Sequence, residues 1–155
     1  MVARVIRVLV VDDSRIVRES ICDLIHDADD MEVAGQAASG EEALALAKHE
    51  NIDLVTLDVQ MPGMDGLQTL QALLAVRPIP VVMVSSVTSK DADATLAALE
   101  IGAVDYVAKA DGMSKTRDAF AEELMRKIRM MAGSDVKRIL AVRRRKRQGL
   151  VAPLP

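Results

Sequence analysis

Residues 57–66 read Leu57-Asp58-Val59-Gln60-Met61-Pro62-Gly63-Met64-Asp65-Gly66 and mark a point where a buried strand passes into a loop. The apolar run at residues 52–57 has the length of one buried strand, and helix-like spacing of apolar residues follows Gly66. Asp58 therefore lies at the carboxyl end of a strand, where doubly wound α/β sheets bind their ligands. Taken alone, Asp58 could equally cap the next helix, because Asp is common in turns.

Four further apolar runs are typical of strands, and helical spacing follows each of them. The expected strands are residues 5–11, 31–37, 52–57, 81–84 and 105–108. The expected helices begin at the cap Ser14, at a Ser39–Glu42 capping box, and near Asp65, Ala94 and Ser114, the last one ending near Gly133. The first of these helices is expected to bury Ile16, Val17, Ile21, Leu24 and Ile25. Five alternations of strand and helix predict one parallel sheet with helices on both faces.

The composition agrees with a single α/β domain of 155 residues. Half of the residues are apolar, but Tyr106 and Phe120 are the only aromatic ones, so the core must be aliphatic. The single Cys22 falls in a helical apolar pattern and is expected to be a buried thiol. No signal peptide and no membrane-spanning run is visible in the sequence, which predicts a cytoplasmic protein without membrane insertion.

The net charge of −3 hides an acidic body and a basic tail. Residues 134–155 carry seven Lys or Arg and one acid, so we expect a domain at residues 4–133 and a basic linker or tail at 134–155. A run of charges is most often a solvated linker. Docking on the acidic body or on another domain is an alternative, and nucleic-acid binding is the least favoured one because no DNA-binding helix follows.

Polar side chains recur where the expected strands end. These side chains are Asp12, Asp13, Asp58, Ser85 and Lys109. Each of them has an ordinary alternative role, such as a helix cap or a solvated surface charge. In a parallel sheet they all lie at one edge, where clustered carboxylates repel each other unless a cation is present. Oxygen ligands of this kind favour Mg²⁺ or Mn²⁺, so the sequence predicts a divalent-metal site at this edge.

These motifs resemble the receiver domain of bacterial two-component response regulators. The residues that carry the resemblance are Leu9–Ser14, Asp58–Gly66, Val84-Ser85 and Lys109. Residues 80–88 and 97–107 further resemble the receiver of the chemotaxis protein-glutamate methylesterase CheB. The resemblance implies a flavodoxin-like (βα)5 fold, with five parallel strands in the order 2-1-3-4-5.

The resemblance also assigns roles to the acidic residues. Asp58 matches the family's phosphoacceptor. Asp13 and Asp58 match the side-chain ligands of Mg²⁺, with the backbone carbonyl of Gln60 as a third ligand, and Asp12 is expected to bind the ion through a water molecule.

Three further residues match the family's switching and phosphoryl-contacting positions. Ser85 matches the switch hydroxyl, Lys109 the lysine that contacts the phosphoryl group, and Tyr106 the switch aromatic. Receivers usually carry a Pro after this lysine, whereas Ala110 follows it here. A cis bond to Ala costs about 3 kcal/mol, so we expect a trans bond and a changed setting of Lys109.

The resemblance implies a signalling switch that is phosphorylated by a chemotaxis-type (CheA-like) histidine kinase. Its expected output is an attached methylesterase domain or a chemoreceptor, and the surface of the fourth helix, fifth strand and fifth helix is an expected dimer interface. The chain lacks the Gly-x-Ser-x-Gly motif of serine hydrolases, and His26 and His49 lie on expected helices away from the strand ends. Esterase chemistry is therefore not expected within these residues, where phosphorylation and autodephosphorylation are the only expected reactions.

Three alternative functions stay open: a stand-alone receiver, a DNA-linked receiver, and a metal-dependent phosphohydrolase with an Asp nucleophile. In its haloacid-dehalogenase form, the phosphohydrolase would need a second Asp at the position of Gln60, which argues against it.

Overall fold

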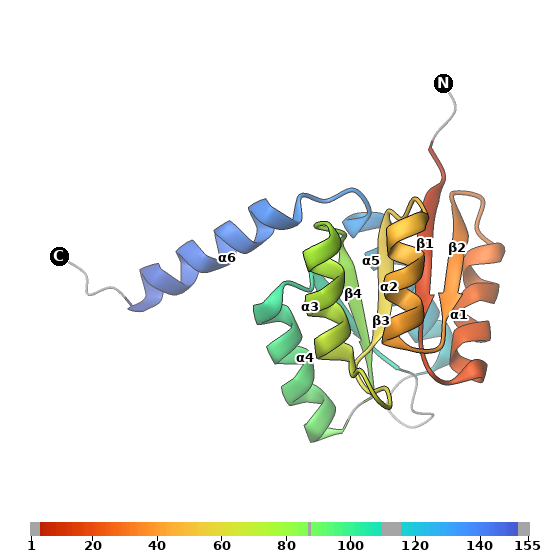
Figure 1. Ribbon diagram of the computed structural model, residues 1–155, viewed down its shortest axis with the longest axis horizontal. Helices are drawn as coiled ribbons and strands as arrows, with labels where there is room; N and C mark the ends of the chain where they lie inside the picture. The colour runs from red at the N-terminus through yellow and green to blue at the C-terminus, as the bar shows by residue number, and fades with distance from the viewer. Residues whose placement is uncertain (1–3, 87, 110–115, 152–155) are drawn as a thin grey trace.

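A computed structural model describes residues 4–86, 88–109 and 116–151, with side chains up to residue 147. Its centre is one five-stranded parallel sheet in the order β2-β1-β3-β4-β5 (Figure 1), which confirms the expected fold and strand order. The strands are β1 (Ile6–Val11), β2 (Met31–Ala37), β3 (Leu54–Asp58), β4 (Val81–Ser85) and β5 (Asp105–Ala108).

The strands form because their residues are mostly β-branched or apolar and both faces of the sheet are covered. Every residue of β3 and β4 is buried, as are the last four of β1. The parallel register pairs Val10 with Thr56 in β3 and Asp58 with Val84 in β4. The carboxyl ends of β1, β3, β4 and β5 therefore meet at one edge.

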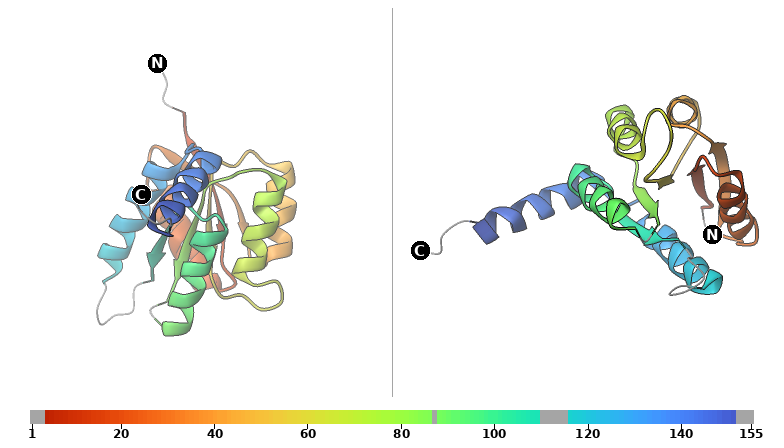
Figure 2. Two further views of the ribbon diagram at one scale, coloured as in Figure 1. Left: turned by 90° about the vertical axis from the view of Figure 1, so that its left-hand side faces the viewer. Right: turned by 90° about the horizontal axis from the view of Figure 1, so that it is seen from below.

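Helices cover both faces of the sheet (Figures 1 and 2). They are α1 (Arg15–His26), α2 (Gly40–His49), α3 (Gly66–Val76), α4 (Ser89–Ile101), α5 (Arg117–Met131) and α6 (Val136–Val151). Residues of α2, α3 and α4 share one apolar cluster with one face of the sheet, and residues of α1 and α5 share a second cluster with the other face. The result is a three-layer α/β/α sandwich.

Each of the first five helices is preceded by an N-cap residue, whose side chain accepts a hydrogen bond from a backbone N–H group of the first turn. These caps are Ser14, Ser39, Asp65, Thr88 and Thr116. The capping box expected at α2 is incomplete. The Glu42 carboxylate accepts from the N–H of Ala38, whereas a capping box requires it to accept from the N–H of Ser39. A complete capping box is present at Asp65 instead, with Gln68 as its partner.

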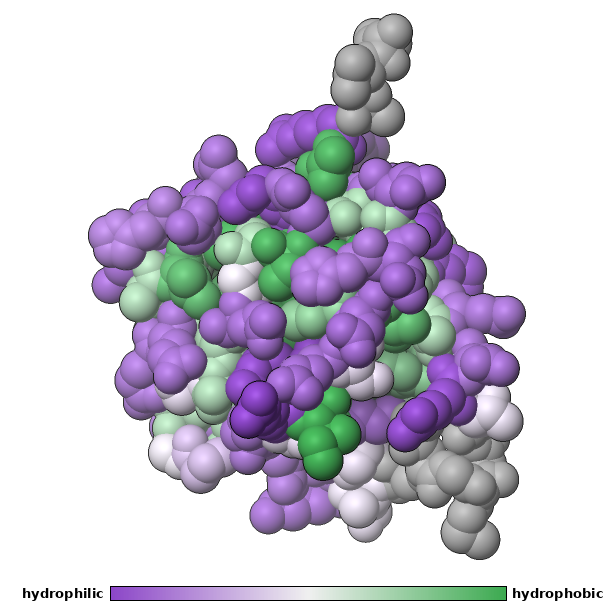
Figure 3. Space-filling view, turned by 90° about the vertical axis from the view of Figure 1, so that its right-hand side faces the viewer, coloured by the Kyte–Doolittle hydropathy of each residue, from purple (hydrophilic) through white to green (hydrophobic). Residues whose placement is uncertain are grey.

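Two sequence expectations about the helices were wrong. Ile16 was expected to be buried, but it is 80% exposed on α1. The side of the molecule shown in Figure 3 is mainly hydrophilic, with hydrophobic residues emerging as separate patches. The fourth helix begins at Ser89, five residues before Ala94, because the polar cap Thr88 precedes the first apolar repeat. The last helix of the body begins at Arg117, and Ser114 lies outside the described residues.

The thiol of Cys22 is buried, as expected, with 3% of the residue exposed. Burial raises the pKa of this thiol to about 11, an effect that the nearby Arg18 partly opposes. His26 and His49 are exposed at the ends of α1 and α2. Among the described residues, none of the helices has the length and apolar character needed to cross a membrane.

Candidate functional site

The register of the sheet brings the polar strand ends together. Asp12 and Asp13 follow β1, Asp58 is the last residue of β3, and Ser85 is the last residue of β4. Lys109 follows β5, and its N–H donates to the carbonyl of Ser85 at 2.7 Å. All five residues predicted from the strand ends thus lie at one edge of the sheet.

Three carboxylates form the centre of this site. Asp12, Asp13 and Asp58 each place a carboxylate oxygen within 4.8 Å of the other two. Asp12 and Asp58 are buried, with 1% and 5% of each residue exposed, whereas Asp13 is open to solvent. The cluster therefore has a buried floor and one exposed side.

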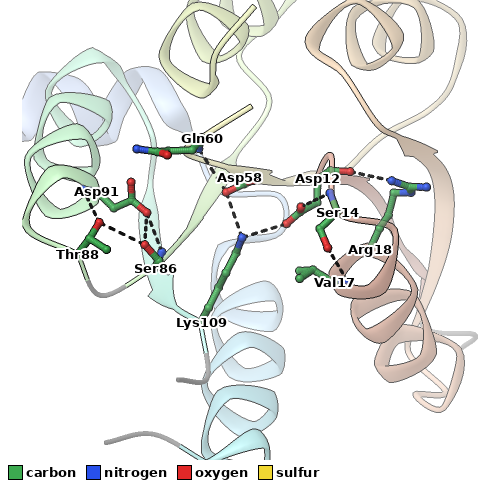
Figure 4. Close-up of polar contacts among 10 residues, drawn as sticks. All are labelled: Asp12, Ser14, Val17, Arg18, Asp58, Gln60, Ser86, Thr88, Asp91 and Lys109. Atoms are coloured by element: carbon green, nitrogen blue, oxygen red, sulfur yellow. Dashed lines mark hydrogen bonds and ion pairs between the residues drawn. The ribbon is translucent and has the colours of Figure 1, made fainter. Parts of the chain in front are cut away.

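Backbone groups hold the two buried carboxylates in place. The N–H of Ser14 donates to Asp12 Oδ1 at 2.9 Å, and the N–H of Gln60 donates to Asp58 Oδ1 at 3.3 Å (Figure 4). The side chain of Arg18 donates to the backbone carbonyl of Asp12 at 2.8 Å. The second oxygen of Asp12, Oδ2, is buried without a hydrogen bond.

Lys109 is the cation that faces these carboxylates. Its Nζ atom lies 3.3 Å from Asp58 Oδ1 and 3.4 Å from Asp12 Oδ2 (Figure 4). One ammonium thus faces two buried carboxylates and an exposed third one. When all three carboxylates are ionised, the cluster therefore carries an excess of negative charge. Like charges at short range disfavour ionisation.

The electrostatics of the site follow from this excess. Burial, together with the charge of Asp12, raises the pKa of Asp58 to about 7, although Lys109 acts in the opposite direction. Burial also raises the pKa of Asp12. Burial alone would lower the pKa of Lys109, but Asp12 and Asp58 outweigh it and raise that pKa. A bound cation would relieve the repulsion between the carboxylates, and their oxygen-only donor set suits a hard divalent ion.

Gly66 allows the backbone of Asp58 and the start of α3 to approach each other closely. A Cβ atom on Gly66 would lie 2.5 Å from the carbonyl oxygens of Asp58 and Val59, a distance that no side chain tolerates. The N–H of Gly66 instead donates to the carbonyl of Val59 at 3.1 Å. A groove of about 420 Å³ opens beside the cluster, with Asp13, Gln60 and Lys90 among its lining residues.

The loop after Ser85 is held by a residue that the sequence interpretation missed. Asp91, in the first turn of α4, is buried, and its Oδ2 atom accepts hydrogen bonds from the backbone N–H and the hydroxyl of Ser86. The hydroxyl of Thr88 accepts from the N–H of Asp91 at 3.2 Å. An acid three residues after a Thr is a known sign of a helix start, so the sequence could have placed the start of α4 at Thr88, but not the contact of Asp91 with Ser86.

Tyr106 lies away from the carboxylates. It is 44% exposed on β5, and Lys127 lies over its ring with the Nζ atom 4.9 Å from the ring centroid. The same ammonium pairs with Asp105 at 3.1 Å and with Glu123 at 3.2 Å. Ala110, the other unusual position, lies outside the described residues, as does its peptide bond.

The response regulator receiver domain family matches residues 8–121 of this chain. The chain is 48% identical over 136 residues to a protein-glutamate methylesterase/protein-glutamine glutaminase 1 of Dechloromonas aromatica, covering 86% of this chain and 39% of that protein. A protein-glutamate methylesterase/protein-glutamine glutaminase from Ralstonia nicotianae is 47% identical over 130 residues, covering 83% and 34% of the two chains. This chain thus spans little more than a third of these relatives.

Solved structures show the same relationship. The response regulator domain of Thermotoga maritima CheB matches with a TM-score of 0.76 and 41% identity, covering 85% of this chain and 99% of that chain. A complex of the CheA3 P1 domain with CheY6 from R. sphaeroides contains a chain that matches with a TM-score of 0.68 and 36% identity, covering 83% and 97%. The chain therefore belongs to the response regulator receiver domain family, and its receiver is of the type found in chemotaxis protein-glutamate methylesterases.

Proposed function

We propose that this receiver is a phosphorylation-dependent switch and that Asp58 accepts the phosphoryl group from a CheA-like histidine kinase. The observation that carries the proposal is the contact of Asp58 with Lys109 at 3.3 Å at the edge where Asp12 and Asp13 also lie. In the reaction, an Asp58 oxygen attacks phosphorus while the bond from phosphorus to the kinase histidine nitrogen breaks. The nitrogen keeps the electron pair, and Asp58 becomes an acyl phosphate.

A divalent cation, Mg²⁺ or alternatively Mn²⁺, fits the residues present. Asp13 and Asp58 would hold it through their carboxylates, Gln60 through its backbone carbonyl, and Asp12 through a water molecule. The buried Asp12 Oδ2 faces the Lys109 ammonium at 3.4 Å but accepts no hydrogen bond, and it supports this assignment because it can accept one from such a water. When bound, the cation neutralises charge on the phosphoryl oxygens. Lys109 adds a positive charge on the other side of Asp58.

The switch residues act after phosphorylation in this proposal. A phosphoryl group adds acceptor oxygens beside Ser85, whose hydroxyl can donate to one of them. Tyr106, now 44% exposed, would turn inward as the loop after Ser85 moves. The surface of α4, β5 and α5 would change with it. Leu96 of α4 is 64% exposed on that helix, which makes this surface a candidate for dimerisation.

We further propose the domain organisation. Residues 4–133 form the receiver, and residues 134–155 link it to an output domain of the methylesterase type. The names and lengths of the methylesterase relatives support this organisation. The output would then act on methylated glutamates of a chemoreceptor, in the cytoplasm.

Phosphorylation from a small phosphodonor tests the proposal. We expect wild-type protein with acetyl phosphate and Mg²⁺ to gain one phosphoryl group by intact mass, and Asp58→Asn to gain none. Asp65→Asn is the matched control, because it alters a carboxylate of the same loop but keeps a good helix cap. Equal labelling of Asp58→Asn and the wild type would refute the assignment.

A further inference from the structure

Helix α6 is attached to the body through its first half. Asp135 caps it by accepting the N–H of Arg138 at 3.0 Å, and Val136 is buried with 2% exposed. Ile139 and Leu140 pack against the apolar cluster of α1 and α5. The rest of α6 projects away from the sandwich (Figures 1 and 2). The described side chains after Leu140 are exposed except that of Arg143.

Arg143 makes the contacts that end this attachment. Its Nη1 atom donates to the carbonyls of Leu99 at 3.0 Å and Ala103 at 2.7 Å, and its Nη2 atom donates to that of Val104 at 2.8 Å. These carbonyls belong to the last turn of α4 and to its connection with β5. The last carbonyls of a helix lack partners within the helix, and a cation there also matches the helix dipole.

The other end of α4 lies beside the loop after β4, at the edge of the sheet where Asp58 lies. Asp91 in its first turn holds Ser86, the neighbour of the switch candidate Ser85. The 13 residues of α4 span about 20 Å at 1.5 Å per residue. One helix therefore has the Ser86–Asp91 contact at its start and the Arg143 contacts at its end.

We propose that Arg143 anchors α6 to the end of α4, and that α6 thereby follows movements of α4 that start at the Ser85 loop. The anchoring part stands on the contacts of Arg143 alone. The coupling part rests on the proposed function, because it needs a signal at Asp58. Arg143 is a positioning residue in this proposal: it sets where the chain after the receiver begins.

Hydrogen–deuterium exchange of the full chain tests the anchor. The variant Arg143→Gln removes the guanidinium, and Arg144→Gln is the matched control because the neighbouring Arg144 is exposed. We expect exchange across residues 137–147 to rise roughly tenfold in Arg143→Gln and to stay near wild type in Arg144→Gln. Arg143→Lys should restore only part of the protection, since the single nitrogen of an ammonium cannot reproduce the planar fork in which Nη1 and Nη2 donate separately. Equal exchange in the two Gln variants would overturn the anchor.

Beryllofluoride with Mg²⁺, a phosphoryl mimic, tests the coupling. We expect it to change α6 exchange in the wild type and in Arg144→Gln, but not in Arg143→Gln. Fluorine NMR reports separately whether the mimic binds. Bound mimic with unchanged α6 exchange in the wild type would overturn the coupling and leave the proposed function intact. Absence of a bound signal would instead contradict the proposed function, and the coupling with it.

Discussion

Replacement of Asp58 by Asn should stabilise the metal-free protein, and more so as the pH rises. The folded pKa of Asp58 is about 7 because of burial and Asp12, above the value of 3.8 for a free Asp. The folded state therefore binds more protons than the unfolded state between these two values, and the stability of the wild type falls as the pH rises through this window. The amide of the Asp58→Asn variant carries no charge, so the free energy of unfolding of the variant does not fall for this reason.

The size of the effect follows from the pKa difference. A difference of about three pKa units corresponds to about 4 kcal/mol above pH 7, and about 2 to 3 kcal/mol of it develops between pH 5 and pH 8. Coupling to Asp12 and the solvent-exposed side at Asp13 reduce this, so we expect Asp58→Asn to gain about 2 kcal/mol over that interval.

Urea unfolding followed by circular dichroism at pH 5, 6, 7 and 8, with EDTA present, measures the difference. Asp93→Asn, at an exposed position of α4, serves as the control and should show no such trend. A stability difference between Asp58→Asn and the wild type that is constant or shrinks with pH would refute the electrostatic reasoning. Addition of Mg²⁺ should reduce the difference, because a cation relieves the repulsion in the wild type.

Three further predictions concern single positions of the site. Asp13→Ala should lose the increase in melting temperature that Mg²⁺ gives the wild type in a thermal scan, and an unchanged increase would exclude Asp13 as a ligand. Gly66→Ala should destabilise the fold by about 2 kcal/mol or more in urea, because its Cβ would meet the carbonyl of Asp58, and a loss below the scatter of surface variants would contradict that contact. Lys109→Met should slow phosphorylation from acetyl phosphate at least tenfold, and wild-type kinetics in this variant would argue against a role for the ammonium. The variant should also be less stable than the wild type without Mg²⁺, because Asp12 and Asp58 lose the cation that pairs with them.

Much of the fold could be predicted because local chemistry and tertiary structure agree. The strand β2 was predicted with its observed bounds, as was β5. A polar break marks one end of each strand, because Asp29 and Asp30 precede β2 and Lys109 follows β5. The clustering of Asp12, Asp13 and Asp58 followed from the parallel topology, which places successive strand ends at one edge. Their individual roles in phosphorylation stay predictions.

The errors arose where sequence pattern and geometry diverge. Ile16 is apolar and near the buried stripe of α1, but it lies about 100° around the helix from Val17 and about 140° from Ile21, so it points outward. Arg143 could not be separated from the other basic residues of its run by sequence, because only the position of α4 gives it carbonyl partners. Asp91 was hidden for a similar reason, since its burial depends on the loop after β4.

The single buried thiol makes the chain convenient for spectroscopy. With a pKa of about 11, Cys22 is almost entirely protonated near neutral pH, whereas the thiolate is the form that attacks thiol-reactive labels. A cysteine introduced at the exposed Ala141 of α6 can therefore take a spin label or a fluorophore in the otherwise natural sequence. A second cysteine can replace the exposed Glu41 of α2 and take a second label. The distance between the two labels would report the orientation of α6 before and after phosphorylation.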